Sequence, residues 1–122
     1  NSDDIFFENL PRNEFLTLMS NASAVIGNSS AGLIETPAFK IPTINIGRRQ
    51  KNRVKAKNVI NIEKYSDQKL LNAVKKIFSK KFKKMVSSVK NPYGNGTSSK
   101  KIIEVIKKTK IDDKLLKKQL TF

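Results

Sequence analysis

Short runs of β-branched residues alternate along this chain with stretches in which apolar residues recur at helical spacing. Loops and turns rich in glycine, proline, serine or asparagine separate most of these segments. Because strands that alternate with helices are joined by crossovers, this pattern predicts a mostly parallel sheet covered by helices on both faces. The predicted strands are residues 5–7, 24–27, 43–46 and 58–62.

The predicted helices complete one α/β domain, a Rossmann-like three-layer fold over residues 1–122. Pro11 begins the first helix, and Ser66 or Asp67 caps a later one. Residues 98–122 form a carboxyl-terminal helical segment in which the amphipathic pattern weakens from residue 109 onward. The helices are predicted at residues 11–19, 30–39, 66–78, 82–89, 98–106 and, weakly, 109–122.

Small polar residues occupy the corner where the second predicted strand ends and the next helix begins. In a parallel sheet this corner and the basic loop at residues 47–57 lie at the same edge, where the carboxyl ends of the strands bind ligands. The start of a helix leaves unpaired backbone N–H groups and a partial positive charge, which favour an anion. The corner therefore predicts an anion site.

The side chains around this corner extend the prediction to a nucleotide. Asn28, Ser29 and Ser30 add hydroxyl and amide donors, and Gly32 removes a side chain from the first helical turn. Glu35 follows about one and a half turns later, where a carboxylate accepts hydrogen bonds from a pair of sugar hydroxyls. The set suits a nucleoside diphosphate. Ser29 or Ser30 acting as an ordinary N-cap explains much of the same pattern, so both interpretations stay open here.

Composition excludes several classes of site. Histidine and cysteine are both absent, so a disulfide framework, a thiolate metal site and a histidine metal site are excluded, and no oxygen-ligand loop is apparent. No apolar run approaches the roughly 20 residues of a membrane span, and the first residues do not resemble a secretory leader. We expect a cytoplasmic protein with no metal, no cofactor and no membrane partner.

A formal net charge of +15 is concentrated in the second half of the chain. Such a surface attracts nucleic acid, yet only four of the 25 basic residues are arginine, the residue that forks onto phosphates and bases. Most lysine pairs alternate with apolar residues, as on the outer face of an amphipathic helix. We favour solvated helical faces. The alternative is a stand-alone basic module that binds nucleic acid or an acidic partner, although no nucleic-acid-binding motif supports it.

Three motifs resemble the UDP-N-acetylglucosamine 2-epimerase family. The string VIGNSSAGLIETP from Val25 to Pro37 is followed by IPTINIGRRQ from Ile41 to Gln50. NPYGNG at residues 91–96 is similar to the later NPYGxG turn of that family, and Leu10-Pro11 with Phe15 lies where the family has a leucine-proline and aromatic segment. The first two strings look closer to the hydrolysing, sialic-acid-pathway branch than to the non-hydrolysing one.

The resemblance implies a piece of a larger enzyme. Family members have two Rossmann-like domains facing each other across a cleft, the glycosyltransferase-B arrangement, and this chain corresponds to most of the carboxyl-terminal one. That domain holds the UDP half of a UDP-sugar, UDP-N-acetylglucosamine or a related compound, opposite an amino-terminal domain that is missing here. Elimination of UDP gives a 2-acetamidoglucal, which is hydrated with inversion at carbon 2. The hydrolysing branch releases N-acetylmannosamine and UDP.

The same resemblance implies roles for individual residues. Ser29 and Ser30 match the corner that contacts the diphosphate, and Glu35 matches the glutamate that binds the ribose. Phe15 matches a position near the uracil, although a helical aromatic is also typical of a core. The further candidates are Arg49 and Arg53, in the GxRQxGR-like loop, suited to phosphate oxygens or to a solvated loop surface.

Two departures from the family pattern limit these expectations. Asn52 stands where that loop usually has its second glycine, which leaves the role of Arg53 open. Tyr93 in the NPYGNG turn sets the turn rather than touching substrate. No residue is assigned a catalytic role, because histidine is absent and the acids form no convergent pair. We therefore expect this chain to be inactive by itself and, with the face toward the missing domain uncovered, open to association as a homo-oligomer.

Overall fold

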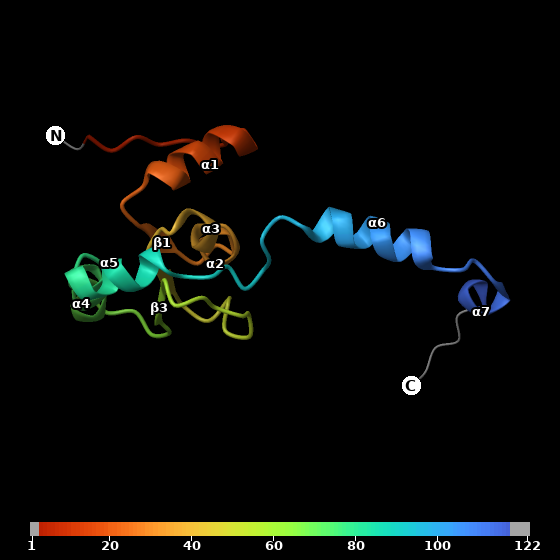
Figure 1. Cartoon of the computed structure of the whole chain (residues 1–122). Coiled ribbons are helices and arrows are strands. Elements are labelled where there is room, and N and C mark those ends of the chain that lie inside the picture. Colours follow the sequence, from red (N-terminus) through yellow and green to blue (C-terminus); the bar gives the residue numbers. More distant parts are fainter. Residues whose placement is uncertain (1–2, 118–122) are drawn as a thin grey trace.

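The computed structural model describes residues 3–117, and within them a three-stranded parallel sheet forms the centre of the fold (Figure 1). The strands lie in the order β1-β2-β3, with Ile26 opposite Ile44 and Ile44 opposite Ile60. This arrangement confirms the predicted α/β class and the parallel sheet. The elements are α1 (Arg12–Asn21), β1 (Val25–Gly27), α2 (Ala31–Ile34), α3 (Thr36–Phe39), β2 (Thr43–Ile46), β3 (Val59–Ile62), α4 (Asp67–Ile77), α5 (Lys80–Ser87), α6 (Ser98–Lys108) and α7 (Asp113–Leu116).

One face of the sheet carries the apolar core. Ile44 and Ile62 are buried there against residues of α4 and α5, among them Ala73, Ile77 and Phe82. The lysines of α4 and α5 lie on the opposite sides of these helices and are exposed, as the amphipathic pattern predicts. Ser66 accepts a hydrogen bond from the backbone N–H of Lys69 at 3.3 Å, which confirms the predicted N-cap of α4.

The other face of the sheet packs against α2 and α3 through a small residue and a buried polar network. A Cβ added to Gly32 would come within 3.0 Å of Thr43 Cγ2, so this glycine permits the close approach of α2 to the sheet. The hydroxyls of Thr36 and Thr43 are 2.8 Å apart. Asn58 donates through Nδ2 to Thr36 Oγ1 at 2.9 Å and to the carbonyl of Ile41 at 2.7 Å. These bonds fix α3 to the sheet.

The strand predicted at residues 5–7 is wrong. These residues are irregular, and Ile5, Phe6 and Phe7 are all exposed, Phe6 to 88%. Apolar residues give a segment β-propensity, but a strand also needs a neighbour to pair its backbone groups. No described strand lies against residues 5–7, since β1, β2 and β3 pair only among themselves.

The helix predicted at residues 30–39 is divided in two. It is broken at Glu35, between α2 and α3, because Pro37 has no N–H to continue the ladder of hydrogen bonds. The next helices follow the prediction within a few residues, except that α7 is a single turn. The tail expected to continue it, including Leu120, lies outside the described residues.

Helix α6 stands apart from the sheet and its covering helices (Figure 1). Its apolar residues Ile102, Ile103, Val105 and Ile106 are each more than half exposed. The lysines on its other side are exposed as well. The amphipathic pattern in this part of the chain therefore forms a helix, but the apolar side of that helix does not pack against the sheet.

Tyr65 precedes α4 and donates a hydrogen bond from its hydroxyl to Asp67 Oδ1 at 2.6 Å. This bond, together with the negative charge of Asp67, raises the pKa of Tyr65 above its ordinary value of 10.0. Because the folded state favours the protonated phenol, the bond contributes to stability below pH 10 and its contribution is lost as the pH rises through the folded-state pKa. The Tyr93→Phe variant has Tyr65 as its single tyrosine. In this variant, the midpoint of phenol ionisation, followed by ultraviolet absorbance, is expected to lie above pH 10. Adding Asp67→Asn should return the midpoint toward 10; an unchanged midpoint would contradict the bond.

Candidate functional site

The serine corner, residues 28–30, follows the end of β1 and leads into α2. Gly27 begins it with a φ of 155°, a backbone conformation that other residues rarely adopt. Ser29 Oγ accepts a hydrogen bond from the backbone N–H of Ala31 at 3.3 Å, whereas the side chain of Ser30 makes no capping bond. Ser30 is therefore the N-cap of α2 by position but makes no capping bond with its side chain, while the Ser29 hydroxyl is engaged in a local turn.

The basic loop, residues 47–57, lies against this corner, as the predicted sheet edge required. Gln50 makes the connection: it is 2% exposed, and its Nε2 donates to the carbonyl oxygen of Asn28 at 2.9 Å. Arg49 and Arg53 flank Gln50 with exposed side chains, and neither forms an ion pair within residues 3–117. Gln50 was not among the predicted site residues, although it belongs to the GxRQxGR-like loop of the resemblance.

Glu35 lies at the break between α2 and α3 and meets an arginine from a different part of the chain. Its Oε1 accepts from Arg12 Nη2 at 3.2 Å, with the Glu35 side chain 25% exposed and that of Arg12 71% exposed. Arg12 begins α1 directly after Leu10-Pro11. Arg12 was not among the predicted site residues, although its position directly after the Leu10-Pro11 motif could have indicated it.

Three further predicted residues have environments that bear on their roles. Phe15 lies on α1 and is 37% exposed, so the alternative of a core aromatic is wrong and its place near a base stays a prediction. Gly32 is buried and faces Thr43, which gives it a packing role on the sheet. Asn28 is exposed, and its carbonyl holds Gln50.

The NPYGNG turn, residues 91–96, reaches the same edge of the domain. Asn91 Nδ2 donates to the carbonyl of Ile34, the last residue of α2, at 3.4 Å. Tyr93 donates from its hydroxyl to the carbonyl of Val54 in the basic loop at 2.8 Å. The serine corner, the basic loop and this turn are thus linked by hydrogen bonds between residues distant in sequence.

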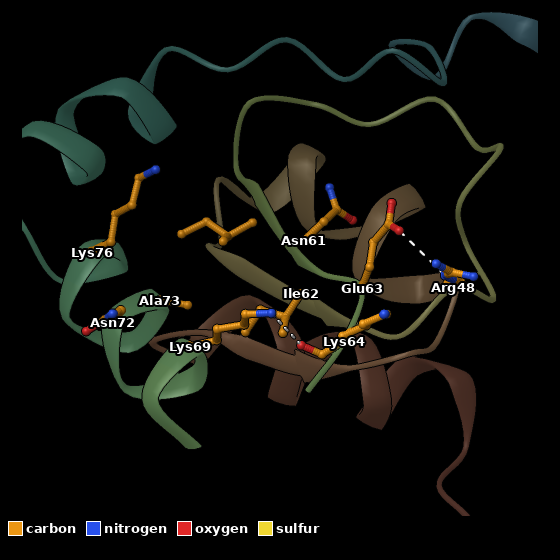
Figure 2. Close-up of a pocket in the computed structure, with 10 residues that line it drawn as sticks. Arg48, Asn61, Ile62, Glu63, Lys64, Lys69, Asn72, Ala73 and Lys76 are labelled. Carbon is orange, nitrogen blue, oxygen red and sulfur yellow. Dashed lines mark hydrogen bonds and ion pairs between the residues drawn. The ribbon is translucent and has the colours of Figure 1, made fainter. Parts of the chain in front are cut away.

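A cavity of about 520 Å³ lies on the far side of β3, between that strand and α4 (Figure 2). Arg48 and Glu63 pair at 3.5 Å on one side of it, and the close-up shows Lys69 directed toward the backbone of Lys64. None of the eight predicted site residues lines this cavity. Arg48 belongs to the basic loop, so the cavity adjoins that loop although it contains none of the predicted side chains.

Residues 3–107 match the family described as UDP-N-acetylglucosamine 2-epimerase. The chain belongs to this family. The matched range includes the serine corner, the basic loop, the NPYGNG turn and most of α6. The motifs of the UDP-N-acetylglucosamine 2-epimerase family thus coincide with the segments that converge at one edge of the sheet.

Curated relatives carry related names. The chain is similar to the GDP/UDP-N,N'-diacetylbacillosamine 2-epimerase (hydrolyzing) of Campylobacter jejuni, 49% identical over 63% of this chain and 19% of that protein. It is 35% identical to polysialic acid biosynthesis protein P7 of Escherichia coli, over 77% of this chain and 24% of that protein. It is 30% identical to the UDP-N,N'-diacetylbacillosamine 2-epimerase (hydrolyzing) of Legionella pneumophila, over 91% of this chain and 28% of that protein. The chain thus spans between a fifth and three tenths of these relatives.

Residues 3–117 lack two further features. No helix in that range has both the length and the apolar content to cross a membrane. The same residues contain no group of three or more acidic, histidine or cysteine side chains arranged to hold a metal ion.

Proposed function

We propose that this chain is the UDP-binding domain of a hydrolysing UDP-sugar 2-epimerase. The observation that carries the proposal is the hydrogen bond from Gln50 to Asn28, which places the basic loop against the serine corner. Donors for an anion and cations for its charge then share one edge of the sheet. The names of the Campylobacter and Legionella relatives, both hydrolysing epimerases, favour the hydrolysing branch.

The proposed roles follow from the chemistry of these groups. The Ser30 hydroxyl and the backbone N–H groups of the serine corner donate to diphosphate oxygens, and Arg49 and Arg53 neutralise their charge. Glu35 accepts hydrogen bonds from the ribose hydroxyls, while Arg12 holds its carboxylate in place. The domain binds and orients the nucleotide, and the elimination of UDP and hydration of the sugar require residues elsewhere in the protein.

Calorimetric titration of the chain with UDP at low and moderate salt tests this proposal. UDP is expected to bind at both salt concentrations, whereas CMP, which lacks uracil and the second phosphate, is expected to bind far more weakly. Equal binding of UDP and CMP that disappears with salt would instead support a nonspecific attraction to the lysine-rich second half. Absence of UDP binding at both salt concentrations would contradict the proposed domain function.

Glu35→Ala is expected to weaken UDP binding about tenfold to a hundredfold, because hydrogen bonds to a charged acceptor contribute about 1.5–3 kcal/mol. Glu104→Ala is the matched control, since Glu104 lies on the exposed helix α6 and its loss changes the net charge equally. Calorimetry of both variants gives the comparison. Equal affinities for UDP would remove Glu35 from the proposed site.

A further inference from the structure

Backbone hydrogen bonds to β3 hold the two ends of the basic loop, from Gly47 N–H to Ile62 at 2.8 Å and from Val59 N–H to Ala56 at 3.2 Å. Between these ends, two side-chain hydrogen bonds attach the loop to the rest of the domain, one in each half. In the first half, Gln50 donates to the carbonyl of Asn28 at 2.9 Å. In the second half, the carbonyl of Val54 accepts from the hydroxyl of Tyr93 at 2.8 Å. The first donor belongs to the loop itself. The second belongs to the NPYGNG turn, where Tyr93 lies 39 residues after Val54.

The turn that carries Tyr93 is itself held firmly. Asn91 bonds through Nδ2 to Ile34, and its Oδ1 accepts from the backbone N–H of Tyr93 at 3.0 Å. Gly94 and Gly96 have φ values of 118° and 84°, which the turn requires and which glycine tolerates. The position of the Tyr93 hydroxyl is therefore set by the end of α2 and by the turn.

Between these two attachments, hydrogen bonds within the loop hold its shape. Apart from the backbone bonds at its two ends and the ion pair of Arg48 with Glu63, its other hydrogen bonds in the described part of the chain are internal. Examples are Lys51 N–H to the carbonyl of Arg48 at 2.9 Å and Lys55 Nζ to the carbonyl of Lys51 at 2.7 Å. Residues 51–54 are all exposed. The loop also carries six cationic side chains and no acid, and like charges that repel one another favour an extended chain.

We infer that Tyr93 is a positioning residue, which together with Gln50 holds the basic loop against the serine corner so that Arg49 and Arg53 face the anionic ligand. This inference rests on the proposed function and adds a role for the NPYGNG turn in binding the diphosphate. Tyr93 does not touch the ligand in this arrangement, because its hydroxyl is engaged with Val54. Its effect is to order the loop before binding, which lowers the entropy lost when the ligand is captured.

Tyr93→Phe tests the inference, since it removes only the hydroxyl from a partly exposed side chain. Tyr65→Phe is the matched control: it removes the other tyrosine hydroxyl, which bonds to Asp67 before α4. The first readout is limited digestion with trypsin, whose cuts at the arginines and lysines of residues 48–57 are identified by mass spectrometry. The second is the dissociation constant for UDP, and the urea midpoint of each variant reports its overall stability.

We expect Tyr93→Phe to accelerate cleavage in the basic loop several-fold and to weaken UDP binding about fivefold, in line with the loss of one hydrogen bond. Tyr65→Phe should leave both values unchanged, and in each variant the urea midpoint should fall only by the small amount expected for the loss of one exposed hydrogen bond. Unchanged loop cleavage in Tyr93→Phe would overturn the inference. Faster cleavage with wild-type UDP affinity would also overturn it, while leaving the proposed function intact. If the wild-type chain does not bind UDP, the proposed function and the inference fail together.

Discussion

Replacing Ile44 by alanine is expected to lower the free energy of unfolding by about 3 to 4 kcal/mol. Ile44 is the central residue of the central strand, is fully buried, and packs with Ile62, Ala73 and Ile77 between the sheet and α4. The substitution removes buried apolar surface and leaves a cavity that a sheet residue fills poorly. Since small domains are stable by only about 5–15 kcal/mol, urea denaturation followed by circular dichroism will detect the change easily.

Ile26→Ala provides the control for this prediction. Ile26 pairs with Ile44 in the neighbouring strand but is 50% exposed, because it lies on the edge strand beyond the reach of the apolar core. The same chemical change is therefore expected to cost about 1 kcal/mol or less. Similar losses from Ile26→Ala and Ile44→Ala would contradict the placement of the core over β2 and β3.

Asn58→Ala is expected to lower the free energy of unfolding by about 3 kcal/mol. Asn58 is fully buried and holds Thr36 and the carbonyl of Ile41 through its Nδ2. Truncation leaves both partners buried without that donor and removes the volume of the carboxamide as well. The measurement is again urea denaturation.

Asn72→Ala controls for the loss of an asparagine side chain. Asn72 is exposed on α4, where its Oδ1 accepts only from Gln68 Nε2 at 3.1 Å, so alanine is expected to be neutral or slightly stabilising there. A loss of less than about 1 kcal/mol in Asn58→Ala would show that the network tolerates the missing donor and that α3 is held by other contacts.

Features with a local cause were predictable from the sequence. The N-cap at Ser66 depends on residues three positions apart, and the strands around Ile44 and Ile60 depend on apolar runs between turns. The strand at residues 5–7 failed because pairing depends on what lies alongside, which apolar character does not determine. The break at Glu35 was visible in principle, since Pro37 cannot continue a helix through its own position.

In the candidate site, too, locally determined features were predictable and contacts between distant residues were not. The serine corner and the basic loop could be placed at one edge because parallel strands end together. The side-chain contacts at this edge could not be predicted. Gln50 bonds to Asn28, 22 positions away in the sequence, and Arg12 bonds to Glu35, 23 positions away. Such pairs depend on the path of each loop and on side-chain conformation, which no local pattern encodes. The role of Tyr93 as a turn residue was predicted, but its bond to Val54 was not.

The strand order has a consequence for how the domain folds. Each strand pairs with the next one along the chain, so no distant segment must be captured before the sheet can form. Short connections lower the entropy lost on closing each loop, which partly offsets the slow formation that is typical of parallel sheets. The serine corner begins the connection from β1 to β2, and the basic loop makes up most of the connection from β2 to β3. They are expected to form in the same step as the sheet, before helix α6, which does not pack against it.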